Sequence, residues 1–251
     1  MLSGVAAVAV AQAAEAGGGA AHESFVWVGL IPGLRELPVH VSVGFVVIGV
    51  LLVSGALVRR ALRDPEAALV PPARLTVANV FEIGIEGLLG LMETVLGHHA
   101  QRFLPLIGTL ALFILLSNLS GLIPGFLPPT DKINTTAACA IVVFVTTHYV
   151  GFKEHGLAYL KHFTGPFWYM APLIFPVEMI GHLVRPVSLS LRLFANIMAD
   201  HLVVGIFLGL IPLIVPIPMM ILGLFVAFVQ TLVFILLSMM YIAGALEEGE
   251  H

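Results

Sequence analysis

Arg192 is the residue of this sequence whose chemistry most needs an explanation. The other polar residues that line up with it in a long apolar segment are Glu178, Arg185, Ser188 and Asn196. On a helix of about 100° per residue, all four fall within about 40° of Arg192 and form one polar stripe. An arginine stays cationic when it is desolvated, so it can make a carboxylate ionise but cannot relay protons by titrating. Charged residues inside a membrane segment indicate a functional site.

A partner for Arg192 is not obvious within its own helix. Glu178 lies about four turns away, some 21 Å along the axis, which makes pairing along one helix unfavourable. Asp200 lies about two turns away on the other side, roughly 80° around the helix, and His201 projects nearly opposite to Arg192. The alternative is an arginine that extends its head group to the membrane surface. We expect instead that Arg192 meets a carboxylate of another chain.

The composition places this stripe in a membrane. Of the 251 residues, 59% are hydrophobic and 10% are charged, and the mean hydropathy is +1.05. A soluble domain has about 25% charged residues, so a water-facing globule is excluded. The net charge of −4 provides no basic surface for nucleic acid. The single cysteine, Cys139, excludes a disulfide scaffold and multi-cysteine metal sites, and we expect no cofactor.

Apolar runs and helical periodicity predict an all-α integral membrane protein. It has about five membrane-embedded helices plus one amphipathic interfacial helix, and the last two helices are long and strongly tilted. The membrane domain covers residues 38–246, with helices at about 38–58, 75–97 (interfacial), 103–123, 133–155, 168–211 and 217–246. A helix from Pro176 to Ile211 would measure about 54 Å against roughly 30 Å of hydrocarbon, so it must tilt strongly or break at Pro186.

The basic residues predict the orientation. Seven of them fall on one side under this topology: Arg59, Arg60, Arg63, Arg74, Arg102, Lys153 and Lys161. The other side has only Arg35 and Lys132, so the first side is expected to be cytoplasmic. Residues 1–37 then form an outside tail, and residues 247–251 form an acidic tail inside. No basic residue precedes Arg35, so a cleaved signal peptide is the less favoured interpretation of the N-terminus.

Other polar residues carry weaker signals. The face of residues 75–97 that bears Glu82, Glu86 and Glu93 is expected to be solvated and to have no proton role. Five histidines lie near expected interfaces, where a solvated or hydrogen-bonded ring is the simpler interpretation: His98, His99, His148, His155 and His162. Four polar residues in the spans suit helix contacts as well as water contacts: Asn118, Ser120, Ser238 and Tyr241.

Three motifs make the sequence similar to a known family. Residues 188–196 (SLSLRLFAN), preceded by Arg185-Pro186-Val187, strongly resemble the signature of the a subunit of bacterial F-type ATP synthases. Residues 225–231 (FVAFVQT) resemble the last helix of that family, and residues 118–125 (NLSGLIPG) resemble its second-span motif. The resemblance covers about residues 20–246 in the order and length of the spans.

The resemblance implies a non-catalytic stator subunit in the bacterial inner membrane. It would lie beside a rotating ring of c subunits and contact the b-subunit peripheral stalk and the rest of the ATP synthase. Two offset aqueous half-channels would pass protons to and from the ring carboxylate during rotation-coupled ATP synthesis. The essential arginine of the family falls on Arg192, its asparagine on Asn196 and its last-helix glutamine on Gln230, while Glu178 matches an acid of the inner half-channel. The complete candidate set for proton translocation is Arg192, Glu178, Asn196, Gln230, Asp200, His201 and Ser188.

The sequence departs from the family on the outer side. Many members pair an acid and a histidine between the last two helices, at the position of His201 and at a position seven residues before the glutamine. The second position is Gly223 here, so Asp200 and His201 are left to supply both groups from one helix. Gly121 occupies a position where some relatives have an aspartate. The outer half-channel is therefore expected to differ from that of the relatives.

Two other classes of function compete with this interpretation. A proton-coupled secondary transporter also uses intramembrane charges and broken helices, but no internal repeat is visible. A membrane enzyme with a histidine-bound metal or haem is the second alternative. The chain lacks the H-E-x-x-H and G-x-S-x-G motifs, which disfavours it.

Overall fold

The computed structural model describes residues 38–61, 76–123, 126–156, 159, 171–210 and 216–247. All regular structure within these ranges is helical, so the expected all-α class is confirmed. The helices are α2 (Val39–Ala61), α4 (Val77–Leu96), α5 (Ala100–Ser120), α6 (Ile133–His155), α8 (Ala171–Leu210) and α9 (Pro216–Glu247). Two short 3-10 helices, η2 (Gly97–His99) and η3 (Pro129–Asp131), precede α5 and α6.

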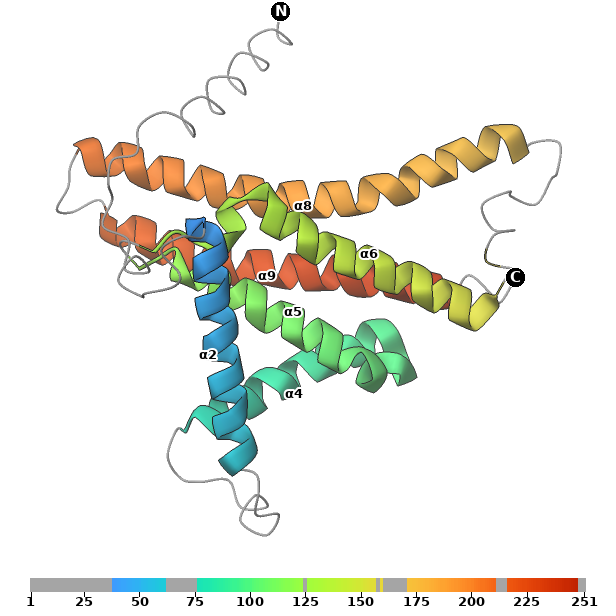
Figure 1. The fold of residues 1–251 in the computed structure, drawn as a ribbon, viewed down its shortest axis with the longest axis horizontal. Helices are drawn as coiled ribbons and strands as arrows, with labels where there is room; N and C mark the ends of the chain where they lie inside the picture. The colour runs from blue at the N-terminus through green and yellow to red at the C-terminus, as the bar shows by residue number, and fades with distance from the viewer. Residues whose placement is uncertain are drawn as a thin grey trace, which may run out of the picture.

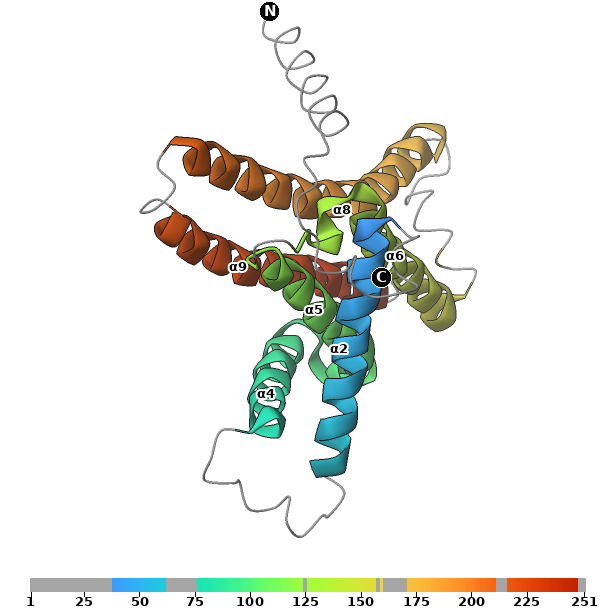
Figure 2. The same cartoon turned by 60° about the vertical axis from the view of Figure 1, so that its left-hand side comes forward.

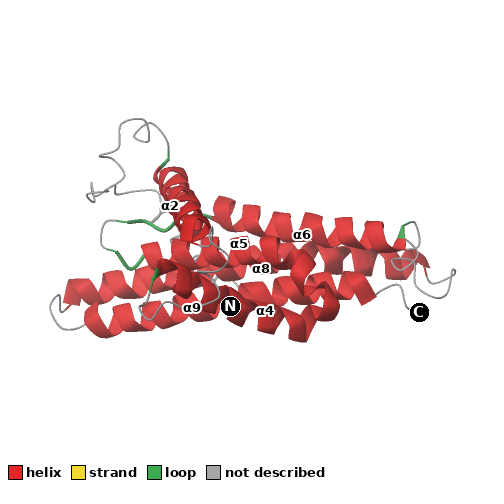
Figure 3. Cartoon of the chain, turned by 90° about the horizontal axis from the view of Figure 1, so that it is seen from below, coloured by secondary structure: helices red, strands yellow, loops and turns green. Residues whose placement is uncertain are grey.

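The long helix α9 lies at the centre of the helix packing. It contacts α4, α5, α6 and α8, and α6 also packs against α8. Figures 1 and 2 show α8 and α9 side by side and running in opposite directions, with α2 standing across them. The view from below in Figure 3 shows α2 projecting from an elongated group of helices. The helices of this chain thus lie at widely different angles to one another.

Within the part of the chain that the structure describes, four helical stretches are long and apolar enough to cross a membrane: Val39–Arg60, Ala78–Ser120, Ile133–His155 and Met220–Leu246. The second stretch joins α4 and α5 through η2, and within it α4 turns its acidic side chains Glu82, Glu86 and Glu93 outward. Met92 and Leu96, near the end of α4, are buried in the core, whereas Val80 and Ile83 are exposed together with the acidic residues.

Helix α8 is continuous across its internal prolines. Its 40 residues include Pro176 and Pro186, and at 1.5 Å per residue they measure about 60 Å. Of the two alternatives that its length left open, strong tilt or a break at Pro186, the break does not occur, and the helix bends gently (Figure 1). A proline removes one backbone hydrogen bond, which permits bending while the neighbouring turns continue. Strong tilt remains the way to place α8 in a bilayer.

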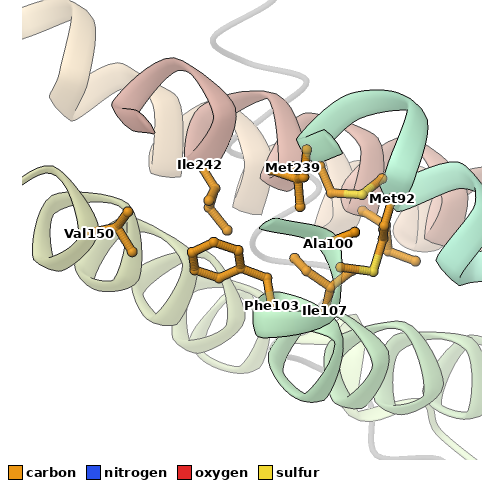
Figure 4. Close-up of a cluster of buried hydrophobic side chains, with 9 residues drawn as sticks. Met92, Ala100, Phe103, Ile107, Val150, Met239 and Ile242 are labelled. Atoms are coloured by element: carbon orange, nitrogen blue, oxygen red, sulfur yellow. The ribbon is translucent and has the colours of Figure 1, made fainter. Parts of the chain in front are cut away.

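Among the described residues, the two larger clusters of buried side chains join the long helices. The first joins α4, α5, α6 and α9, and Figure 4 shows Phe103 and Ile107 of α5 close to Met239 and Ile242 of α9. The second joins α5, α6, α8 and α9, and it includes Leu189 and Leu193, which are 2% and 0% exposed. Because Leu189 and Leu193 flank Arg192, burial of these leucines determines which face of α8 remains open.

Polar contacts tie the helices together at both ends of the group. At one end, Arg102 of α5 pairs with Glu154 of α6 at 2.5 Å. Beside this pair, His155 lies within hydrogen-bond distance of the Ala245 carbonyl of α9, at 3.2 Å. At the other end, the Thr130 hydroxyl of η3 donates to Asn118 Oδ1 of α5 at 3.1 Å. These contacts hold the ends of α5, α6 and α9 in register around α8.

Candidate functional site

Arg192 lies on the open face of α8, near the middle of the helix. Its side chain is exposed in the isolated chain, and within the described residues its guanidinium makes no ion pair. Ser188, Ala195 and Ala199 are exposed on the same side of the helix. Arg192 is thus a permanent cation flanked by small side chains, so that a second helix can approach closely and bring a counter-charge.

Asn196 and Gln230 link α8 to α9 one turn beyond Arg192. The Asn196 side-chain amide donates to Gln230 Oε1 at 2.5 Å, and Gln230 is only 4% exposed. The sequence proposed both residues separately, and the structure brings them into direct contact. The bond satisfies a buried amide and fixes the position of α9 beside Arg192.

A cavity of about 30 Å³ lies at the Asp200 end of the site, between α5, α8 and α9. The space open to the centre of a water molecule is large enough for about two waters. The polar side chains that line it are Asn118, Asp200 and Gln230. Gln230 therefore contacts both this cavity and Asn196. The polar groups continue through Asn196 toward Arg192, one turn away.

Gly223 creates the space that Asp200 occupies. A Cβ atom at residue 223 would lie 2.8 Å from Asp200 Oδ2 and 3.0 Å from Leu122 Cδ2. Both distances are shorter than ordinary van der Waals contacts of about 3.5–4.0 Å. Asp200 of α8 thus reaches across to the space beside the backbone of Gly223 on α9. Gly121 lines the same cavity.

Glu178 lies at the opposite end of α8 from Asp200. Its side chain is 35% exposed, and its Oε1 lies 3.4 Å from Nε2 of His182, which is only 2% exposed. His182 was not among the residues proposed from the sequence, although its i, i+4 spacing from the acid was a usable signal. Arg185 places its guanidinium carbon 5.5 Å from the centre of the Tyr241 ring on α9.

The remaining candidates are less well defined. Ser188 is exposed one turn before Arg192. His201 belongs to α8, but its side chain lies outside the described part of the chain. Across the described ranges, no group of three or more histidine, cysteine or acidic residues is arranged to hold a metal ion.

Comparison with known proteins identifies a family over most of the chain. Residues 42–243 match the family model described as ATP synthase A chain. The chain is 53% identical over 203 residues to ATP synthase subunit a of Trichlorobacter lovleyi, covering 81% of this chain and 85% of the relative. It is 48% identical over 220 residues to the protein of the same name from Geotalea uraniireducens, with 84% and 93% covered. A relative with this name from Geobacter sulfurreducens is 56% identical over 171 residues, with 68% and 75% covered.

Proposed function

The chain belongs to the ATP synthase subunit a family, the proton-conducting membrane subunit of F-type ATP synthases, and from that membership we propose how it conducts protons. Two half-channels, one at the Asp200 end of α8 and one at the Glu178 end, lead to a ring of c subunits. They meet the ring on either side of Arg192. Membership of this family decides against the secondary transporter considered from the sequence.

The exposed cation of Arg192 is the observation that carries this proposal. An arginine on an apolar, lipid-facing helix is costly unless a carboxylate pairs with it. Large apolar side chains are also exposed elsewhere on the two long helices, among them Val187 and Leu191 of α8 and Phe228 of α9, each more than 40% exposed. Such a surface fits a ring of apolar helices that brings one carboxylate at a time to Arg192.

Arg192 separates the two half-channels by its charge. A protonated ring carboxylate is neutral and can face lipid, whereas the ionised form is attracted to the guanidinium. A ring carboxylate that approaches Arg192 therefore gives up its proton on one side. It takes up another on the other side after it has passed. Because arginine does not lose its own proton, no proton crosses directly between the half-channels at this point.

The Asp200 cavity supports a half-channel on that side. Asp200 and Gln230 share the cavity, and Gln230 is bonded to Asn196 next to Arg192. The carboxylate, one or two waters and the two amides form a continuous series of polar groups. His201 follows Asp200 directly in the sequence and adds an imidazole to the polar groups of this half-channel. Ser188 is a polar contact for the ring on the Glu178 side of Arg192.

The distribution of basic residues orients the two half-channels. We place Asp200 on the outer side and Glu178 on the cytoplasmic side, with the N-terminus outside and the C-terminus inside. The ring of c subunits contacts the open face of α8 and α9. The b subunit and the remaining complex hold the chain against rotation, and the chain itself carries no catalytic residue for ATP.

Substitutions of Arg192 in the whole ATP synthase test this function. Arg192→Lys should abolish ATP-driven proton pumping, because a desolvated ammonium can lose its proton whereas guanidinium cannot. Arg192→Ala should also abolish coupling and permit passive proton leak through the complex. Both are measured in inverted membrane vesicles by the quenching of a pH-sensitive dye. Pumping near the wild-type rate in the lysine variant would contradict the role given to Arg192.

A further inference from the structure

A second cavity lies on the Glu178 side of Arg192, between α6, α8 and α9. Its polar lining consists of Thr147 and His148 of α6, His182 and Arg185 of α8, and Tyr241 of α9. The space open to the centre of a water molecule is about 10 Å³, enough for about one water. The proton path proposed above uses Glu178 but none of these cavity residues.

His182 connects this cavity to Glu178. The imidazole is 2% exposed, whereas the Glu178 side chain is 35% exposed, and Nε2 and Oε1 of the two residues lie 3.4 Å apart. The pair therefore spans the boundary between the open face of α8 and its packed face. A polar ring that is buried at this depth is stabilised by its polar neighbours.

His148 provides a second imidazole behind His182. The two ring centres are 5.4 Å apart in an edge-to-face arrangement. Nδ1 of His148 lies 2.9 Å from the Phe144 carbonyl, so in the neutral ring this nitrogen holds the hydrogen and Nε2 is the acceptor. The Tyr159 ring contacts His148 from the side, with 6.1 Å between the ring centres.

The charges around the pair come from three helices. On α8, Glu178 and Arg185 flank His182 within one turn on either side. On α6, His148 is the titratable neighbour, and α9 contributes Tyr241, whose ring lies against Arg185. Burial of the ring and the permanent charge of Arg185 disfavour a charged His182, whereas the carboxylate of Glu178 offsets this in part. The cluster is thus suited to passing a single proton on to Glu178 rather than to holding it.

We propose that His182, supported by His148, is a positioning and proton-exchange residue for Glu178. The Nε2 hydrogen of His182 orients the Glu178 carboxylate. When Nδ1 takes up a proton from water, the Nε2–H bond breaks and its proton forms the O–H bond of Glu178, with the reverse sequence for flow in the other direction. This inference rests on the proposed function, because it assigns His182 a role only through Glu178.

Inverted membrane vesicles that contain the whole ATP synthase test the proposal, since their medium contacts the cytoplasmic side. The initial rate of ATP-driven proton uptake is measured while the pH of the medium is varied from about 5.5 to 8. His182→Gln keeps a hydrogen-bonding side chain but does not titrate. We expect its rate to fall about fivefold, the effect of losing one ordinary hydrogen bond, and its pH profile to flatten. His148→Gln should also lower the rate and flatten the pH profile.

Two comparisons separate this role from a structural one. His98→Gln removes an exposed histidine on η2, and its profile should match the wild type. Adding His182→Gln to Glu178→Gln should cause no further loss, because His182 acts through the acid. The amount of each variant in the membrane is measured alongside. If His182→Gln does not assemble, His148→Gln provides the same test at a half-buried position.

The outcomes distinguish this inference from the function on which it rests. Wild-type pH profiles in both histidine variants, or an equal loss when Glu178 is already glutamine, would overturn the role of His182. The function would still stand if Arg192→Ala had lost coupling in the same vesicles. Normal pumping by Arg192→Ala would instead reject the proposed function itself.

Discussion

The contact between Asp200 and Gly223 allows a sharp test of the outer half-channel. Gly223→Ala adds one methyl group that would lie 2.8 Å from Asp200 Oδ2 and 3.0 Å from Leu122 Cδ2. Both neighbours must retreat by several tenths of an ångström or more to reach ordinary contact distances of about 3.5–4.0 Å. The substitution thus moves the carboxylate while leaving its chemistry intact.

The magnitude follows from the kind of atoms that must move. Overpacking costs about 1–3 kcal/mol, and the lower end applies because both atoms are ends of flexible side chains. A cost of about 1 kcal/mol lowers the occupancy of the present Asp200 position about fivefold. If protons pass through this carboxylate, proton-driven ATP synthesis should fall by a similar factor.

The assay is ATP synthesis driven by an imposed pH difference in vesicles that contain the whole complex. Gly244→Ala is the matched control, since a Cβ at that position of α9 meets no atom within 4 Å, and its rate should stay at the wild-type level. The double variant with Gly223→His and Asp200→Gly moves the titratable group from α8 to α9. Its rate of ATP synthesis should be higher than that of Asp200→Gly alone. A wild-type rate for Gly223→Ala, with the protein present in normal amount, would refute the assignment of Asp200 to the proton path.

Further substitutions test other parts of the site and the packing of the helices. Glu178→Gln should slow proton pumping several-fold while the complex stays assembled, which a pumping assay with a measured subunit content will show. The effects of Asn196→Ala and Gln230→Ala on the rate of proton flux should be non-additive, because the two side chains share one hydrogen bond. A double-mutant cycle should give a coupling of about 1 kcal/mol. Additive effects would mean that the bond does not contribute. Gly151→Ala should reduce the amount of folded protein in the membrane, because a Cβ there overlaps the ring of buried Tyr159, whereas Gly156→Val would test backbone strain instead.

The sequence determined the properties that a single helix can carry. Composition identified the bilayer as the solvent, and helical periodicity placed Arg192, Ser188 and Asn196 on one face of one long helix. The motifs around Arg192 pointed to the family that the comparisons then established. These inferences succeeded because side-chain direction along a helix depends only on spacing.

Only the tertiary structure decided what each face meets. Spacing along α8 could not show that Asn196 bonds to Gln230, that Asp200 fills the space beside Gly223, or that His182 lies buried next to His148. His148 was expected to be solvated or hydrogen-bonded, and it lies within hydrogen-bond distance of the Phe144 carbonyl, but the sequence did not show that its ring is half-buried among aromatic rings. Contacts between helices depend on their register and crossing angle, which arise from the packing of many side chains at once. For the same reason, the lack of a proton-carrying side chain at Gly223 could be interpreted only once the position of Asp200 on the neighbouring helix was known.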